Sequence, residues 1–386
     1  MKIVLLGSVN PLDFDLSDAD SKRVNGRKFG RSVPVSDLAI TLAELGHEVF
    51  VIGVVGIVNS VLSLTTQNGV KLIYVLGRQQ KKLKAITFYS VERQSILSQI
   101  ASIKPDLVHA HWTYEYALAA QDSGLPYVIT VHDDPWEIFK GFRNLYFFLR
   151  LLVAIRVRSR GTENFIFVSE YIRTRWNSGI FKASGEVIPN MNRLENDQLD
   201  GSKQANQVIS VGTADRRKNI RQLLVAWEIA LLTNPYLRLH LVGPGLGVGD
   251  SLAREFDSKF EYGQVTWHGS VTRRELSNIY SKCKILVHPS LHESFGLIYL
   301  EAFSCNLGVI TFAKSGSAEE IVGDAGIILK KESSQCLADA ILTLTSNQTL
   351  LNELTQKGRS RLKLHSPDLI TRRYISLYER IIGAMT

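Results

Sequence analysis

The order of apolar runs along the chain is the feature that most restricts its fold. Short stretches rich in β-branched residues alternate with longer amphipathic stretches, which predicts buried parallel strands with helices between them. The first series of expected strands comprises residues 2–6, 49–53, 72–75, 107–110, 127–131 and 165–168. The second comprises residues 208–211, 237–242, 265–267, 285–288 and 308–311. We therefore predict an α/β fold with two doubly wound, Rossmann-like domains.

A polar segment separates the two series of strands. Residues 189–202 contain Pro189 and several Asn and Asp residues, which suit a linker. We expect residues 1–192 to form the N-terminal domain and residues 193–365 to form the C-terminal domain. Sheets of this kind bind ligands at the carboxyl ends of their strands, so a cleft between two facing domains is the expected site.

The last segment of the chain has the pattern of a single helix. Ser366 is a suitable N-cap residue, and Pro367 suits the first helical position. One face of the expected helix is apolar, with Ile370, Tyr374, Leu377 and Ile381. We expect this helix, within residues 366–386, to pack back on the first domain.

The composition narrows the class of protein. A hydrophobic share of 45% and a charged share of 21% are typical of a soluble globular protein. The formal net charge of +8 suits anionic small molecules or an anionic membrane surface, whereas no basic arm or RNA-binding signature predicts a nucleic-acid partner. Cys283, Cys305 and Cys336 lack metal-ligand spacing and are expected to be reduced thiols. With no signal peptide or membrane span in the pattern, we expect a cytoplasmic protein.

The string HPSLHESFGLIYLEAFSC at residues 288–305 carries the strongest chemical signal. An expected strand ends in a Pro-Ser turn, and a helix begins near Gly296. The amides of Gly296, Leu297 and Ile298 would form a site for an anion such as a diphosphate. Glu293 and Glu301 flank this site and could accept hydrogen bonds from sugar hydroxyls. The alternative is an ordinary amphipathic helix with two surface glutamates.

This string resembles the hallmark of the retaining glycosyltransferases of family 4, the glycosyl transferases group 1, which have the two-domain GT-B fold. The hallmark is a Glu, seven residues and a second Glu, and it is matched by Glu293, Ser294, Phe295, Gly296, Leu297 and Glu301. The resemblance implies that Glu293 contacts the transferred sugar and that Glu301 binds the ribose hydroxyls. It also implies that the backbone after Phe295, as far as Ile298, binds the diphosphate.

A basic run lies where the second domain begins its first helix. Arg217 and Lys218 could neutralise a leaving diphosphate, where negative charge grows as the glycosidic bond breaks. The family typically has Val-Gly-Arg and then Lys-Gly here, so Lys218 matches, whereas Thr213 stands where the first Arg often lies. Arg217 could supply the second charge. The alternative is a solvated basic helix terminus.

Other positions match the family more weakly. Gly243 matches a Gly-x-Gly turn, and His268 matches a turn near the nucleoside, although either could serve the turn alone. The glycines after residue 242 fail the G-x-G-x-x-G pattern, which argues against a dinucleotide site. In the first domain, Gly30 aligns with the second of two glycines that face the donor diphosphate, and Phe29 replaces the first.

His111 lies at the carboxyl end of an expected strand, where we expect the chain to turn and expose its imidazole. The resemblance implies that this imidazole hydrogen-bonds a sugar hydroxyl. The Asp-x-Asp pairs at residues 13–15 and 18–20 are interpreted as solvated turns in an irregular loop, so no metal site is expected.

Residues 139–161 carry six basic residues and no acidic one. Such a stretch could contact an anionic membrane surface, or it could be a half-buried helix with an Arg-rich outer face.

These patterns together predict a metal-independent retaining hexosyltransferase. The expected donor is a UDP- or GDP-linked sugar, and no further cofactor is expected. The expected acceptor is a glycan, a lipid-linked glycan or a small molecule, in the synthesis of cell-surface polysaccharide or glycoconjugate. The enzyme would work in the cytoplasm or at the inner face of the membrane. Two alternatives stay open: a non-catalytic nucleotide-sugar-binding subunit, and a sugar-nucleotide epimerase or hydrolase on the same fold.

Overall fold

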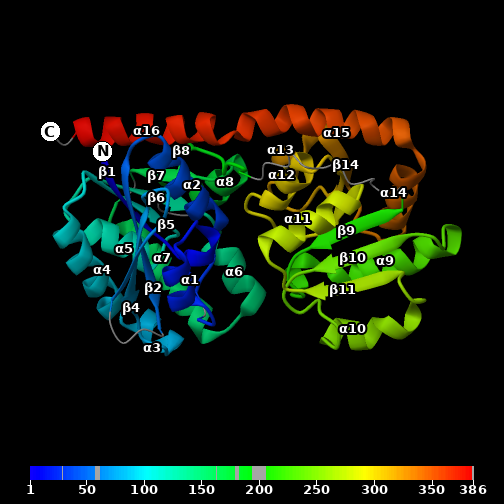
Figure 1. The fold of residues 1–386 in the computed structure, drawn as a ribbon, viewed down its shortest axis with the longest axis horizontal. Helices are drawn as coiled ribbons and strands as arrows, with labels where there is room; N and C mark the ends of the chain where they lie inside the picture. The colour runs from blue at the N-terminus through cyan, green and yellow to red at the C-terminus, as the bar shows by residue number, and fades with distance from the viewer. Residues whose placement is uncertain (28, 57–60, 162, 179–181, 194–205, 385–386) are drawn as a thin grey trace. The chain divides into compact units, whose positions relative to one another are not determined.

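The computed structural model describes residues 1–27, 29–56, 61–161, 163–178, 182–193 and 206–384 (Figure 1). The chain divides into two compact units, Met1–Met191 with Ser366–Thr386, and Asn192–His365. The expected linker at residues 189–202 lies largely outside the described residues.

The first unit is built on an eight-stranded sheet in the order β3-β4-β2-β1-β5-β6-β7-β8. All neighbours pair in parallel except β3 and β4. Because consecutive strands are added outward on both sides of the β1–β5 pair, their carboxyl ends form the topological switch point. The strands are β1 (Lys2–Leu6), β2 (Glu48–Val55), β3 (Leu62–Thr65), β4 (Lys71–Leu76), β5 (Leu107–His111), β6 (Tyr127–Val131), β7 (Phe165–Phe167) and β8 (Gly185–Val187).

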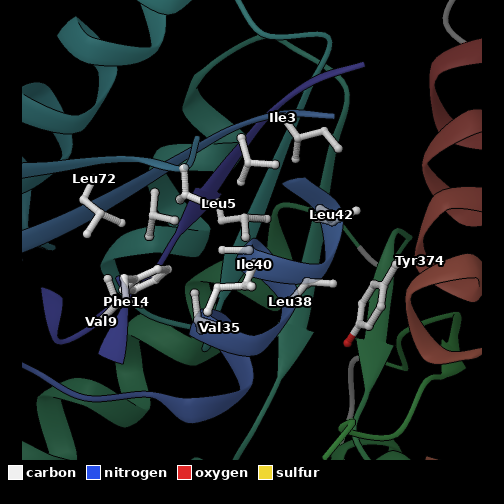
Figure 2. Packing of buried hydrophobic residues seen from close by; sticks show 14 of the residues in the cluster. Ile3, Leu5, Val9, Phe14, Val35, Leu38, Ile40, Leu42, Leu72 and Tyr374 are labelled. Carbon is white, nitrogen blue, oxygen red and sulfur yellow. The ribbon is translucent and has the colours of Figure 1, made fainter. Parts of the chain in front are cut away.

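Helices cover both faces of this sheet, with α4 and α5 on one side and α2 on the other (Figure 1). Figure 2 shows Val35 and Leu38 of α2 packed beside Ile3 and Leu5 of β1. The central strands β1 and β5 are buried except at Lys2, as expected where a parallel sheet is covered on both faces, and β5 carries His109 and His111 among its apolar residues. The helices are α1 (Asp18–Val24), α2 (Val33–Glu44), α3 (Lys81–Ile86), α4 (Ser90–Ile103), α5 (Glu115–Asp122), α6 (Pro135–Phe142), α7 (Leu145–Ser159), α8 (Glu170–Asn177) and the C-terminal α16 (Pro367–Gly383), with a 3-10 turn, η1, at Pro11–Asp13.

The C-terminal helix α16 shares the core of the first unit. Ile370, Tyr374, Tyr378 and Ile381 are buried in the same cluster as α2 and β1 (Figure 2). Ser366 occupies the N-cap position, but its side chain makes no capping hydrogen bond. Burial of the apolar face therefore stabilises this helix more than its cap does.

The second unit contains a six-stranded, fully parallel sheet in the order β11-β10-β9-β12-β13-β14. Its strands are β9 (Gln207–Val211), β10 (Arg238–Val242), β11 (Val265–Gly269), β12 (Ile285–His288), β13 (Gly308–Phe312) and β14 (Gly326–Leu329). Its helices are α9 (Ile220–Thr233), α10 (Ser251–Phe256), α11 (Arg273–Lys282), α12 (Leu297–Ser304), α13 (Ala318–Ile321), α14 (Ser334–Ser346) and α15 (Gln348–Leu362), with 3-10 turns η2 (Arg216–Lys218), η3 (Asp257–Lys259), η4 (Gly323–Ala325) and η5 (Lys363–His365). The α/β fold with two Rossmann-like sheets is therefore confirmed.

One local expectation is wrong in part. Of the Asp-x-Asp pairs near the N-terminus, Asp13 ends η1, and Asp18 and Asp20 lie in the first turn of α1, whereas Asp15 lies in the irregular segment between them. Acidic side chains are favourable at a helix N-terminus, and Ser17 caps this one. Among the described residues, no group of three or more His, Cys, Asp or Glu side chains could hold a metal ion.

The described part of the chain contains no helix that combines the length and the apolar character needed to cross a membrane.

Candidate active site

The loop after β9 fixes the position of Lys218. Asp215 caps η2, because its Oδ1 accepts hydrogen bonds from the backbone N–H groups of Arg217 at 2.9 Å and Lys218 at 3.3 Å. Its Oδ2 accepts a hydrogen bond from the Thr213 hydroxyl. Burial would raise the pKa of Asp215, but these hydrogen bonds and the charge of Arg217 hold it below its usual range. Thr213 thus orders the turn through Asp215 and supplies no charge of its own.

A backbone contact brings this loop to the Pro-Ser turn after β12. The carbonyl oxygen of Arg217 accepts hydrogen bonds from the Leu291 N–H at 2.8 Å and from the Ser290 hydroxyl at 3.3 Å. The side chain of Arg217 itself is half exposed and lies 3.6 Å from Asp215. The two loops therefore hold Lys218 against the segment that carries Glu293.

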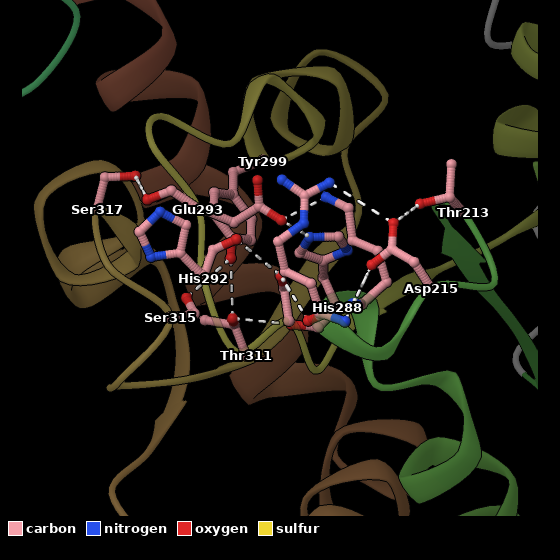
Figure 3. Close-up of polar contacts among 12 residues, drawn as sticks. Thr213, Asp215, His288, His292, Glu293, Tyr299, Thr311, Ser315 and Ser317 are labelled. Atoms are coloured by element: carbon pink, nitrogen blue, oxygen red, sulfur yellow. Dashed lines mark hydrogen bonds and ion pairs between the residues drawn. The ribbon is translucent and has the colours of Figure 1, made fainter. Parts of the chain in front are cut away.

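Glu293 is the centre of the polar cluster in Figure 3. Its Oε1 accepts hydrogen bonds from Lys218 Nζ and, at 2.8 Å, from His288 Nε2. Burial alone would raise the pKa of Glu293, yet the charge of Lys218 and the bond from His288 hold it far below its usual range. Burial lowers the pKa of His288, so this side chain is neutral and donates from Nε2. Glu293 is therefore a buried, ionised carboxylate with both donors on one oxygen.

The backbone of Glu293 is fixed by the loop after β13. Its N–H donates to the Ser315 carbonyl at 2.7 Å, and its own carbonyl accepts from the Ser317 N–H at 3.1 Å and the Ser317 hydroxyl at 3.2 Å (Figure 3). Tyr299 of α12 bonds Thr311 at 2.9 Å, and Thr311 donates to the carbonyl of His288 at 2.9 Å. This network holds the carboxylate rigidly, as a substrate-positioning group requires.

Gly296 starts helix α12 as predicted. Its φ of 81° lies in the left-handed region, and a Cβ there would lie 2.5 Å from the ring of Tyr299. Only glycine fits this position. Ser294 and Phe295 precede it, and the buried Phe295 ring packs edge-on against His365. The first N–H groups of α12, at Leu297 and Ile298, lack helical acceptors by geometry and can bind an anion.

Glu301 lies inside α12 and is held by a residue that the sequence did not reveal. The hydroxyl of Tyr280, on α11, donates to Glu301 Oε2 at 2.9 Å. Tyr280 is fully buried, and burial raises the pKa of its hydroxyl well above the usual value. The hydroxyl therefore stays protonated and orients the carboxylate.

Gly243 and His268 both take part in contacts within the second unit. Gly243 lies so close to the loop of Lys218 that a Cβ would be 1.9 Å from the carbonyl oxygen of Gly212. His268 Nε2 lies 2.9 Å from His240 Nδ1, and His240 Nε2 lies 2.6 Å from the side-chain oxygen of Gln207. Contacts within the described residues therefore explain both the glycine at 243 and the histidine at 268.

In the first unit, Gly30 packs against the end of β1. A Cβ at Gly30 would lie 2.7 Å from the Cβ of Ser8, so the glycine allows this close approach. The hydroxyl of Ser8 lies 3.2 Å from that of Tyr116, which accepts a hydrogen bond from the Val54 N–H at 3.1 Å. The loop of Gly30 is thereby seated at the carboxyl end of the central strands.

The expectation that His111 is exposed is wrong. The chain does turn at Trp112, whose φ is 65°, but the His111 ring is buried between the rings of His109 and His132, with centroids 4.2 and 5.2 Å away. Its Nδ1 lies 2.9 Å from His132 Nε2, while its Nε2 has no hydrogen-bond partner among the described residues. Burial lowers the pKa of His111 well below its usual value and that of His132 to about 3. The neutral His111 ring thus keeps one unpartnered polar atom, which is itself buried in this structure.

Sequence reasoning missed the roles of Asp215, His288 and Tyr280. Asp215 carries a readable signal, since an Asp directly before Arg-Arg-Lys is a capping pattern. The other two act through side-chain contacts with the glutamates, which no local pattern reveals.

Two doubly wound domains, with a buried lysine–glutamate pair beside a glycine-started helix, define a glycosyltransferase of the GT-B class. The family described as Glycosyl transferases group 1 matches residues 192–361, and Glycosyltransferase Family 4 matches residues 32–195. The chain therefore belongs to the glycosyltransferases that these two models describe.

Individual relatives agree with this assignment. An uncharacterized glycosyltransferase of Bacillus subtilis, YqgM, is 27% identical over 72% of this chain and 79% of its own. The O-antigen chain mannosyltransferase B of Escherichia coli is 29% identical over 44% of each chain. The structure of sucrose-phosphate synthase from Thermosynechococcus elongatus matches all of both chains with a TM-score of 0.80 at 20% identity, which shows the shared fold.

Proposed function

We propose that this glycosyltransferase is a metal-independent enzyme that transfers a hexosyl group with retention from a UDP- or GDP-linked sugar. The observation that carries the proposal is the convergence of Lys218 and His288 on one oxygen of Glu293, just before the helix that Gly296 starts. A buried ion pair beside an anion-binding helix N-terminus suits a sugar diphosphate, which presents hydroxyls and negative charge together.

Each donor contact in the proposal uses a group described above. The diphosphate binds the amides of Gly296, Leu297 and Ile298, with Ser294 and Phe295 shaping the approach. Glu301 accepts hydrogen bonds from the ribose, and Gly243 and His268 lie on the nucleoside side. Both partners of Glu293 reach Oε1 in the described residues, which leaves Oε2 for a hydroxyl of the transferred sugar.

The proposed reaction breaks the bond between the anomeric carbon and the diphosphate oxygen. The electron pair goes to the diphosphate, where Lys218, Arg217 and the helix amides stabilise the growing charge. The acceptor hydroxyl attacks from the face that the diphosphate leaves, which retains the configuration. Its proton passes to the departing phosphate, so neither a protein nucleophile nor a metal ion is needed.

In the first unit, His111 and Gly30 are proposed to serve the same reaction. The Nε2 of His111 would bond a sugar hydroxyl once the side chains that cover it move aside, and the loop of Gly30 would approach the diphosphate. The acceptor class that fits best is a surface polysaccharide or lipid-linked glycan, which agrees with the name of the O-antigen relative. Such an enzyme would use the nucleotide sugars of the cytoplasm.

The test of the donor site is thermal shift with UDP, GDP and ADP, on the wild-type protein and on Glu301→Ala. We expect one nucleotide to raise the melting temperature, and this rise to be largely lost in Glu301→Ala, because a carboxylate–ribose bond is removed. Stabilisation by one nucleotide would also identify the base. If millimolar concentrations of all three leave the melting temperature unchanged, the donor site as proposed is wrong, and the non-catalytic alternative gains.

Tyr280→Phe tests how Glu301 is positioned. Loss of one buried hydrogen bond should raise the KM for the donor by about five- to tenfold and leave kcat nearly unchanged, because the bond orients a ground-state contact. Tyr262→Phe is the matched control, since Tyr262 is fully exposed in the same unit. Steady-state kinetics separate the two effects, and a fall in kcat at constant KM would contradict the positioning role.

A further inference from the structure

Helix α7 presents apolar side chains on both of its faces. Its inner face packs Val153, Ala154 and Val157 into the first unit. Its outer face carries a stripe of four apolar residues. They are three, four and three positions apart, so they lie along one side of the helix. The residues of this stripe are 37–53% exposed, and they are Leu145, Phe148, Leu152 and Ile155. An exposed apolar stripe of this length on the side opposite the buried face marks a surface for a partner.

The expected alternative, a half-buried helix with an Arg-rich outer face, holds only in part, because Arg156 is exposed whereas Arg150 and Arg158 are not. The guanidinium of Arg150 lies inward, 3.7 Å from the centre of the Tyr114 ring. Arg158 lies 4.7 Å from the centre of the Trp176 ring and donates to the Trp176 carbonyl at 2.6 Å. These two arginines anchor the helix to its own unit and leave its apolar stripe outward.

Two helices that contact α7 carry further exposed apolar side chains. Helix α6 contacts α7, with Phe139 and Phe148 at a ring distance of 5.7 Å, and it adds the exposed Phe142. Helix α3 also contacts α7, and it adds the exposed Leu83 and Ile86. We define the α3–α7 face as this set of exposed residues: Leu83, Ile86, Phe142, Leu145, Phe148, Leu152 and Ile155.

The rim of the α3–α7 face is cationic. Lys81, Lys82, Arg143 and Arg156 are exposed beside it, and none of the four makes an ion pair with a carboxylate among the described residues. By contrast, Lys140 pairs with Glu137 and Arg160 pairs with Asp122. The face therefore combines an uncovered apolar stripe with uncompensated positive charge.

We propose that the α3–α7 face binds the surface of a bilayer that contains anionic phospholipid. Its apolar side chains would insert at the boundary between headgroups and acyl chains, and its lysines and arginines would contact the phosphates. A second copy of the chain fits less well, because a symmetric pairing would bring the two cationic rims together. This proposal is independent of the donor site and concerns where the enzyme works.

Flotation with lipid vesicles tests the proposal on the whole protein. We expect the wild-type chain to bind vesicles of equal parts phosphatidylcholine and phosphatidylglycerol, and to bind pure phosphatidylcholine far less. The double variant F148S/L152S should lower the partition coefficient by about tenfold or more, because two large apolar side chains no longer insert. The charge variant K81Q/K82Q should lose much of the preference for phosphatidylglycerol.

Leu232→Ser is the matched control, since Leu232 is 88% exposed on α9 of the second unit and lies outside the face. The melting temperature of each variant and its shift with nucleotide show that the fold and the donor site are intact. Equal binding by F148S/L152S and the wild type, or no binding by the wild type, would overturn the proposal. A wild-type dimer that F148S/L152S converts to a monomer, without vesicle binding, would instead assign the face to contacts between copies.

Discussion

Lys218→Ala is expected to lower kcat by about 10²–10³-fold, with a much smaller effect on nucleotide binding. A preformed cation beside a leaving group stabilises charge that develops only in the transition state, and removal of one such group typically costs this much. Lys218 suits the role because its ammonium is already held against Glu293, so little reorganisation is needed. Steady-state turnover and the thermal shift with nucleotide would measure the two effects separately.

Loss of Lys218 also removes a partner of the buried Glu293 carboxylate. Without Lys218, Glu293 keeps only the bond from His288, so some loss of stability is expected. Lys218→Gln keeps a donor near Glu293 without the charge, and it should be as inactive as the alanine variant but closer to wild type in melting temperature. Arg216→Ala removes an exposed cation from the same turn and should leave kcat nearly unchanged. Wild-type turnover in a folded Lys218→Ala protein would exclude the role.

The strands that the sequence revealed and those that it did not differ in their position in the sheets. Every expected strand is present within a few residues, and all of them except β11 are inner strands, most of which are largely apolar. The three strands that were missed, β3, β8 and β14, all lie at the edge of a sheet. Their burial is alternating or incomplete, since an edge strand is covered less, and the short runs of three or four residues carry little signal.

The candidate site shows a similar division. The segment from Glu293 to Glu301 was readable because its glycine and its helix start are local requirements of the chain. The groups that orient these residues were not readable, because His288, Tyr280 and Ser317 reach them from separate elements. The burial of His111 was missed because the ring of His132, which follows β6, covers it together with the ring of His109 on its own strand.

The second large effect is expected for Gly243→Ala, which should destabilise the second unit by about 3 kcal/mol or more and lower its melting temperature by roughly 10 °C. A Cβ at this position would lie 1.9 Å from the Gly212 carbonyl oxygen and 2.8 Å from its carbon, and the φ of 134° is itself unfavourable for alanine. Gly212 N donates to Val242 at 2.9 Å, and Gly243 N donates to Gly269 at 2.7 Å. Neither loop can therefore move without breaking hydrogen bonds at the strand ends.

Gly249→Ala is the matched control, because Gly249 has a φ of 79° in the same loop but no atom within 4 Å of its added Cβ. It should cost only the backbone term, about 1 kcal/mol. Equal melting temperatures for the two variants would disprove the close approach of the loops.

The pair of variants also separates two explanations for the glycine at position 243. If Gly243 mainly positions the loop of Lys218, the Gly243→Ala variant should lose turnover more than nucleotide binding. The comparison is made at a low temperature, where the variant is still folded. If Gly243 instead contacts the donor directly, nucleotide binding should fall first.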